Sequence, residues 1–264
     1  GGVIIKAVAS ASGKVPLTDR RTLLREFCLL RTLRHEAVVR AEAMLETKFD
    51  SWLVLDFPTT TTVQSYVDSR GPLQESAATG LFAQLLHGLA HIHGFGVAHS
   101  GVSPSSMLFD DRASSLKITD FGHARFSSTG CSVLGAQDDD AVGPCAGSVE
   151  QAHARVPSPA LAYQAPEQLL RRRWNERVDI WSAGLSFHFK LLSRLPFDVQ
   201  DDITLELLKA GRLCGDGGLF GGMPVWAANM LRRCLAVPAL SRPSASELLQ
   251  AIVLEKTSGR DASA

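Results

Sequence analysis

The chain has 264 residues, and 45% of them are hydrophobic, which is enough to build the core of one large domain or of two lobes. Lys and Arg together number 27, as do Asp and Glu, so the formal net charge is zero. This balance excludes an overall bias toward nucleic acid or an anionic membrane, and partners have to be inferred from local features.

The cysteines and the apolar runs bear on where the protein works. Five cysteines are present, and none forms a CxxC pair or the spacing of a metal finger, which suits a reducing compartment and predicts a cytoplasmic location. No apolar run approaches the roughly 18 residues of a membrane span, and the first of the given residues do not show the basic-then-apolar pattern of a signal peptide. The chain begins with Gly1-Gly2 instead of Met, so we expect it to be a piece of a longer protein.

The first part of the chain predicts three short strands and one helix. Residues 3–9 are apolar and β-branched, which favours a strand. A helix is expected from Thr18 onward, because apolar residues recur at helical spacing over residues 23–33. Residues 38–45 and 52–57 indicate two further strands.

The rest of the chain predicts a mainly helical body. Residues 58–62 and 68–72 carry loop chemistry, which places a boundary near residue 57. Helical patterns follow at residues 75–93, 179–194, 203–210, 223–235 and 244–255. The sequence therefore predicts an α+β protein in which a small strand-rich part precedes a larger helical part.

Four short motifs occur in the order found in a known family. They are the segment 99–106 (His-Ser-Gly-Val-Ser-Pro-Ser-Ser), 120–122 (Asp-Phe-Gly), 165–167 (Ala-Pro-Glu) and 179–184 (Asp-Ile-Trp-Ser-Ala-Gly). In that order they resemble the catalytic loop, the metal-binding motif, the end of the activation segment and the supporting helix of protein kinases. Residues 116–122 are similar to calcium-regulated serine/threonine kinases in particular.

The resemblance implies a bilobal protein-kinase-like fold of the α+β class. A truncated N-lobe with the hinge would span residues 1–57, the C-lobe residues 58–256 and a tail residues 257–264. The activation segment would be residues 120–167, with a mobile insert at about 129–158, where Gly, Ala, Ser and Pro are frequent.

The resemblance places six residues on the nucleotide side of the site: Lys6, Glu26, Leu55, Asp56, Phe57 and Asp120. Lys6 ends a Val-Ile-Ile-Lys run and would contact the α- and β-phosphates, with Glu26 as its ion-pair partner. Leu55 would be the gatekeeper, and residues 56–58 would run along the adenine edge. Asp120 would coordinate the Mg²⁺ that bridges the phosphates.

Three further residues take structural roles by the same resemblance: Glu167, Asp179 and Arg242. Arg242 is expected to pair with Glu167, and Asp179 begins the helix that supports the catalytic loop. A buried charge needs its partner, and losing one member costs about 3–5 kcal/mol. These residues predict a folded C-lobe and carry no information about catalysis.

The catalytic loop departs from the family where the chemistry is done. Gly101 stands where kinases carry the Asp that accepts the substrate proton, a role worth roughly 10²–10⁴ in rate. Ser103 replaces the Lys that neutralises the transferring phosphate, and Ser106 replaces the Asn that holds a second Mg²⁺. Ser100 replaces the Arg that would clamp a phosphorylated activation segment.

Two features oppose the Mg-ATP binding that the family implies. No glycine-rich loop precedes Lys6 in these residues, and Ile4 adds bulk where the family has Ala. Two functions therefore stay open. One is a pseudokinase that acts as a protein-binding or allosteric module. The other is a weak serine/threonine kinase that uses another base, such as Asp111 or Glu150.

The partners expected under both functions are proteins. Neither nucleic acid nor a membrane is expected, given the charge balance and the absence of a long apolar run. The acidic runs at residues 110–111 and 138–140 lack the spacing of an EF-hand, so calcium binding is not supported.

Overall fold

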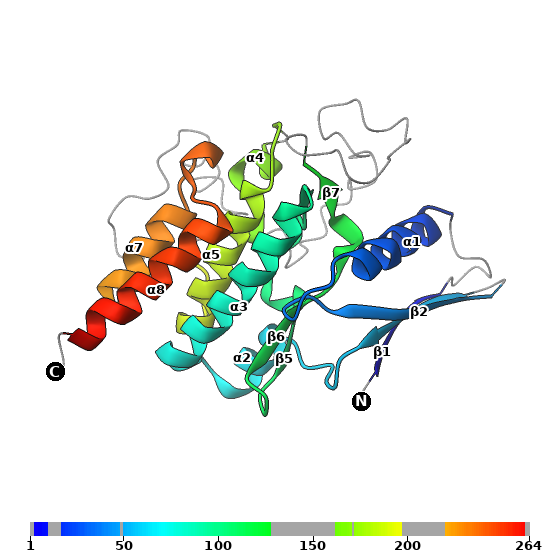
Figure 1. The fold of residues 1–264 in the computed structure, drawn as a ribbon, viewed down its shortest axis with the longest axis horizontal. Helices are drawn as coiled ribbons and strands as arrows, with labels where there is room; N and C mark the ends of the chain where they lie inside the picture. Colours follow the sequence, from blue (N-terminus) through cyan, green and yellow to red (C-terminus); the bar gives the residue numbers. More distant parts are fainter. Residues whose placement is uncertain are drawn as a thin grey trace.

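A small antiparallel sheet and one helix form the first lobe of the molecule. The computed structural model describes residues 3–9, 17–47, 50–127, 162–170, 172–196 and 220–261. The lobe contains β1 (Val3–Ala9), α1 (Leu17–Thr32), β2 (Arg40–Glu46) and β3 (Asp50–Asp56), with the strands in the order β1-β3-β2. Figure 1 shows this lobe at one end of the molecule and the long helices at the other.

The central strand explains why the sheet and α1 pack together. Leu53 and Leu55 of β3 are buried, while the residues next to them in the strand are only half-buried or exposed, as the two-residue period of a strand requires. Leu23 and Leu30 of α1 are buried in the same core. The predicted number and order of elements in this lobe is therefore confirmed.

The ends of two strands differ from the prediction. β2 begins at Arg40 instead of residue 38, and β3 spans Asp50–Asp56 instead of residues 52–57. Val39 donates its N–H to the carbonyl of Ile118 at 2.9 Å, and Ile118 donates to the carbonyl of Ala37 at 2.8 Å. The apolar residues before β2 therefore join the first lobe to the second, and they do not extend the sheet.

A short helix that overlaps the predicted loop at residues 68–72 follows the sheet. α2 spans Val63–Arg70, so the predicted loop at residues 68–72 is wrong for its first three residues. Thr62 and Ser65 form a capping box, in which the backbone N–H of each donates to the side-chain oxygen of the other. Gly71 ends the helix with φ at 82°, a conformation that glycine adopts without strain. These polar residues mark the two ends of a helix.

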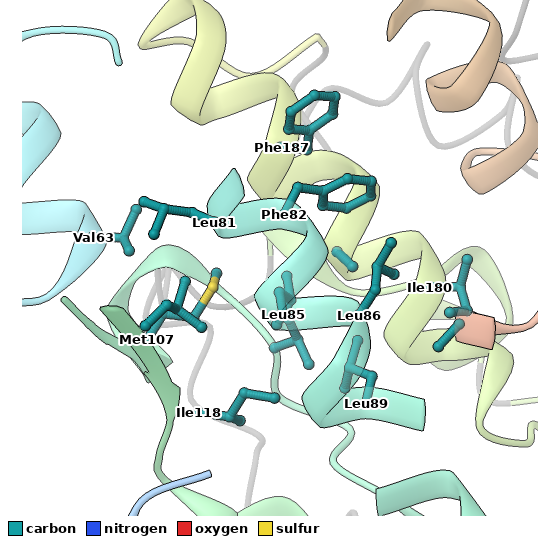
Figure 2. Packing of buried hydrophobic residues seen from close by; sticks show 14 of the residues in the cluster. Val63, Leu81, Phe82, Leu85, Leu86, Leu89, Met107, Ile118, Ile180 and Phe187 are labelled. Atoms are coloured by element: carbon teal, nitrogen blue, oxygen red, sulfur yellow. The ribbon is translucent and has the colours of Figure 1, made fainter. Parts of the chain in front are cut away.

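The second lobe is built around two long buried helices. α3 (Glu75–Gly94) lies beside α5 (Arg177–Leu192), and every residue of α5 from Val178 to Lys190 is buried. Figure 2 shows Leu81, Phe82, Leu85, Leu86 and Leu89 of α3 packed among Met107, Ile118, Ile180 and Phe187. The rings of Phe82 and Phe187 stack with their centroids 4.4 Å apart.

Three further helices complete the described part of this lobe. They are α4 (Pro166–Leu169), α7 (Val225–Cys234) and α8 (Ala245–Asp261). α8 continues past residue 256, so the predicted tail at residues 257–264 is helical as far as Asp261. The predicted insert at residues 129–158 and the predicted helix at residues 203–210 lie outside the described residues. No described helix combines the length and apolar character needed to cross a membrane.

Two short antiparallel ribbons hold the loops that matter for function. β4 (Val97–Ala98) pairs with β7 (Arg125–Phe126), and β5 (Met107–Asp110) pairs with β6 (Ser115–Ile118). The segment 99–106 therefore runs from β4 to β5, and the segment 119–124 runs from β6 to β7. Because these strands pair, the two loops lie next to each other.

Candidate functional site

Three charged side chains from separate elements meet between the two lobes. The Nζ of Lys6, on β1, donates to Glu26 Oε2 at 2.8 Å and to Asp120 Oδ1 at 2.7 Å. Glu26 lies on α1 and is 1% exposed, whereas the side chain of Asp120, just after β6, is 53% exposed. The structure thus brings together Lys6, which is expected to contact the phosphates, its expected partner Glu26, and Asp120, which is expected to bind the metal ion. The side chain of Asp120 is open to a ligand.

The three side chains control one another's charge. Burial lowers the pKa of Lys6, but the carboxylates of Glu26 and Asp120 outweigh it and raise the pKa above its ordinary value. Burial raises the pKa of Asp120, but the Lys6 ammonium outweighs it, with smaller contributions from His99 and His123, and the pKa falls below its ordinary value. Lys6 and Asp120 are therefore both charged at neutral pH, as binding of a metal and a phosphate requires.

The backbone after β6 turns sharply to place Asp120. Asp120 has φ at 65° and ψ at 62°, in the left-handed region, which a short polar residue tolerates better than a branched one. The N–H of the next residue, Phe121, donates to Glu26 Oε1 at 3.1 Å. Glu26 therefore holds Lys6 with one oxygen and the Asp-Phe-Gly backbone with the other.

The segment 99–106 is anchored to the start of α5 by hydrogen bonds to Asp179. Asp179, fully buried at the start of α5, accepts the N–H groups of His99 at 2.8 Å and Ser100 at 2.7 Å. The Nε2 of His93 lies 2.9 Å from the same carboxylate. These contacts show why Asp179 is needed: without them two buried or half-buried backbone N–H groups would lose their acceptor.

His99 ties this segment to the loop that carries Asp120. Its Nε2 lies 2.9 Å from the carbonyl oxygen of Thr119, and its Nδ1 accepts the N–H of Gly101 at 3.3 Å. This pattern corresponds to a neutral ring with its proton on Nε2. Burial lowers the pKa of His99, against an opposing effect of Asp179, which favours the same neutral form. The ring also packs edge-on against Phe121, with centroids 4.7 Å apart.

Gly101 leaves room for a side chain where the family has its proton acceptor. A Cβ placed on Gly101 would meet no atom closer than 3.5 Å, and its φ is not among the positive angles of the described residues. Neither space nor backbone conformation therefore requires glycine. The nearest atom belongs to His123, a residue that sequence reasoning missed and that directly follows the Asp-Phe-Gly motif.

Ser103 and Ser106 bond to each other within the segment. Ser106 Oγ donates to the carbonyl of Ser103 at 3.0 Å and accepts the N–H of Ser103 at 2.9 Å. Both residues are buried: Ser103 is 5% exposed and Ser106 is 3% exposed. The Ser106 hydroxyl is therefore used to close a turn of 3₁₀ helix (Pro104–Ser106) and is not directed at a ligand.

The expected hinge residues lie at the end of β3. Leu55 and Phe57 are buried, whereas Asp56 is exposed. Leu55 pairs with Ile4 in the sheet, and Leu53, two positions earlier in β3, pairs with Lys6. Leu55 therefore lies on the strand next to the one that carries Lys6. The contact of these three residues with adenine stays a prediction.

The expected structural pair is present in the second lobe. Arg242 donates to both carboxylate oxygens of Glu167, at 2.6 and 2.8 Å. The guanidinium also lies over the ring of Trp181, 5.0 Å from its centroid. Arg242 is 1% exposed, so the pair fixes the start of α4, where the resemblance places the end of the activation segment, against the body of the lobe.

The residues fit one phosphate-bound metal ion and not a second. Lys6 and the exposed Asp120 would hold a Mg²⁺-bound phosphate, which would place a nucleoside triphosphate between the lobes. Ser106 gives no amide, and its hydroxyl is engaged in the loop. Of the two substitute bases, Asp111 pairs with Arg70 at 2.7 Å, and Glu150 lies outside the described residues.

Comparison with known proteins agrees with this geometry. The family model described as "Protein kinase domain" matches residues 3–254. CBL-interacting protein kinase 4 of Oryza sativa subsp. japonica is 34% identical over 239 residues, which cover 89% of this chain and 46% of the relative. CBL-interacting protein kinase 22 of the same plant is 38% identical over 178 residues, covering 66% and 36%.

A third relative lies in a differently named group of kinases. The SNF1-related protein kinase catalytic subunit alpha KIN12 of Arabidopsis thaliana is 27% identical over 233 residues, covering 86% of this chain and 41% of the relative. The chain spans less than half the length of each of these three proteins. By the family match over residues 3–254 and by its α+β fold, the chain belongs to the protein kinase domain family.

Proposed function

We propose that this chain is a catalytically impaired protein kinase domain that works mainly as a protein-binding or allosteric module. Gly101 carries the proposal, because the loop around it is formed and anchored by Asp179 and Thr119 yet has no side chain at the position of the proton acceptor. Loss of a general base costs roughly 10²–10⁴ in rate, or about 3–5.5 kcal/mol of barrier.

The comparisons and the cysteines support the remaining parts of the proposal. Two of the relatives are named as interacting with CBL, which supports a protein as the partner of this chain too. The cysteine spacing supports a cytoplasmic location.

A weak serine/threonine kinase is the second candidate. The contacts of Lys6 with Glu26 and Asp120 favour it, because these residues are already assembled as Mg-ATP binding requires. In this case the chain would transfer the γ-phosphoryl group of ATP to a protein hydroxyl slowly, and binding of Mg-ATP would be retained.

The test restores the missing carboxylate. Gly101→Asp introduces it at a position with space for a Cβ, and transfer of radiolabelled phosphate to casein is compared with the unchanged chain. We expect Gly101→Asp to raise the rate by at least about 10² if impairment follows from the lost base. Asp120→Asn in both backgrounds gives the rate without the metal ligand. A wild-type rate equal to that of Gly101→Asp would overturn the proposal.

Thermal stabilisation separates binding from transfer. The melting temperature is measured with ATP, with and without Mg²⁺, for the wild type and for Asp120→Asn. Mg²⁺-dependent stabilisation that Asp120→Asn removes would support a nucleotide-binding module. Equal melting temperatures under all conditions would support a module that works without nucleotide.

A further inference from the structure

We propose that the imidazole of His123 takes the place of the missing carboxylate and accepts the proton of the substrate hydroxyl in the residual phosphoryl transfer. The inference rests on the second candidate of the proposed function, the weak serine/threonine kinase, since it concerns the slow phosphoryl transfer of that kinase. It assigns a role to a residue outside the catalytic loop.

The position of His123 carries the inference. A Cβ built on Gly101 would lie 3.5 Å from Cδ2 and 3.6 Å from Cβ of His123, which is ordinary van der Waals contact. The imidazole therefore lies beside the space that an aspartate side chain would enter. His123 is also exposed, so a substrate hydroxyl can reach its ring.

Both sides of this contact are held in place. His123 belongs to a turn of 3₁₀ helix (Phe121–His123) that is closed by the N–H of Ala124 donating to the carbonyl of Phe121 at 3.0 Å. Phe121 is fixed in turn by Glu26 through its N–H and by the ring of His99. Gly101 donates its own N–H to that same His99 ring, so His99 positions both partners.

His123 also lies close enough to Asp120 to affect its charge. Burial has the largest effect on the pKa of Asp120 and raises it, and Lys6 has the next largest and lowers it. His123 makes a smaller contribution that also lowers this pKa. The imidazole therefore lies in the electrostatic neighbourhood of the carboxylate expected to hold the metal-bound phosphate. A proton acceptor has to be near that phosphate, because the hydroxyl it activates attacks the phosphorus.

The other candidate bases are engaged. Asp111 is held by Arg70 at 2.7 Å and lies 3.3 Å from the hydroxyl of Tyr66. His99 is fully buried and uses both ring nitrogens within the loops. Imidazole is the side chain that most often serves as a general base near neutral pH.

In the proposed step, one proton and one phosphoryl group are transferred. The hydroxyl of a protein Ser or Thr loses its proton to a ring nitrogen of neutral His123, and its oxygen forms a bond to the γ-phosphorus of Mg-bound ATP. The bond between that phosphorus and the β–γ bridging oxygen breaks, and ADP leaves with the electron pair. The imidazolium then releases its proton to water, which regenerates the base.

Mutation of His123 tests the step directly. Radiolabel transfer to casein is measured for the wild type, His123→Ala, and His87→Ala as a matched exposed histidine on α3. We expect His123→Ala to lower the rate of transfer by about 10-fold to 10²-fold, and His87→Ala to transfer at the wild-type rate. Adding Gly101→Asp to His123→Ala should restore transfer.

A chemical probe gives a readout that does not depend on turnover. Diethyl pyrocarbonate modification of His123 is followed by mass spectrometry with and without Mg²⁺ and a non-hydrolysable ATP analogue, with His87 as the internal control. We expect several-fold slower modification of His123 with the analogue, an effect that Asp120→Asn removes.

Three results would overturn the inference. They are an unchanged rate in His123→Ala, equal modification of His123 with and without the analogue, and a wild-type rate no higher than that of Asp120→Asn. The last result would leave the proposed function standing. The proposed function fails separately, if the wild type is as fast as Gly101→Asp.

Discussion

Removing the charge of Glu167 while keeping its shape should destabilise the second lobe strongly. Glu167→Gln leaves the guanidinium of Arg242 buried without a carboxylate. In the native protein that guanidinium is 1% exposed and makes two charged contacts with Glu167, at 2.6 and 2.8 Å. Solvent therefore cannot replace the lost partner.

The magnitude follows from what Arg242 keeps. Its Nε donates to the carbonyl of Ala236 at 2.7 Å, and its terminal nitrogens donate to the carbonyls of Val237 at 3.0 Å and Arg177 at 3.1 Å. These neutral acceptors remain in the variant, so the loss is mainly one of charge compensation. We expect the free energy of unfolding to fall by about 3–5 kcal/mol, the usual cost of breaking a buried pair, and toward the lower end of that range.

Urea unfolding followed by circular dichroism measures this loss. Glu42→Gln is the matched control, because Glu42 pairs with Arg40 at 2.9 Å on the surface, with side chains 36% and 55% exposed. Exposed pairs contribute about 0–1 kcal/mol, so the control should unfold close to the wild type. If Glu167→Gln lost no more than Glu42→Gln, the pair would not hold the activation segment to the lobe.

Two further predictions concern pH. Burial lowers the pKa of Lys190 to about 7, and its Nζ has no hydrogen-bond partner among the described residues. The folded chain then binds fewer protons than the unfolded chain between about pH 7 and 10, so the free energy of unfolding should rise with pH over that range. Lys190→Met should remove this slope and stabilise the protein at pH 7 by about 1–4 kcal/mol, and an equal or lower melting temperature would contradict it. His35 stacks on His91, with ring centroids 4.9 Å apart. The pKa of His35 is lowered, mainly by burial and next by His91. The melting temperature should therefore fall as the pH drops from about 7 to 5, and less steeply in His35→Asn; identical slopes would refute this.

The parts of the fold that local patterns specify were predicted from the sequence. The strand at residues 3–9 has its predicted bounds, and the helices α3 and α5 lie within two residues of theirs. α2 was not predicted because the Thr and Gly residues at its two ends are also typical of loops. The capping box of Thr62 and Ser65 can be told from a turn only when the positions of both side chains are known. The start of β2 was placed two residues too early because the buried apolar residues before it bond to Ile118 at the end of β6.

Some residues of the candidate site could likewise be assigned from the sequence, and others only from the structure. Lys6, Glu26 and Asp120 could be assigned from ordered motifs, and the structure places them in direct contact. The role of Ser106 could not be assigned from the sequence, because its hydroxyl could face either a ligand or the loop. Only its hydrogen bonds to Ser103 decide that it faces the loop.

The sequence by itself determined the family, the order of the elements and the loss of the carboxylate at Gly101, because these depend on residue type and spacing along the chain. The tertiary structure alone decided which side chain lies beside that glycine. His123 is separated from Gly101 by the β5–β6 ribbon, and the His99 contacts with Thr119 and Phe121 bring the two loops together. Such a contact depends on how distant segments pack, and no local period of the sequence encodes it.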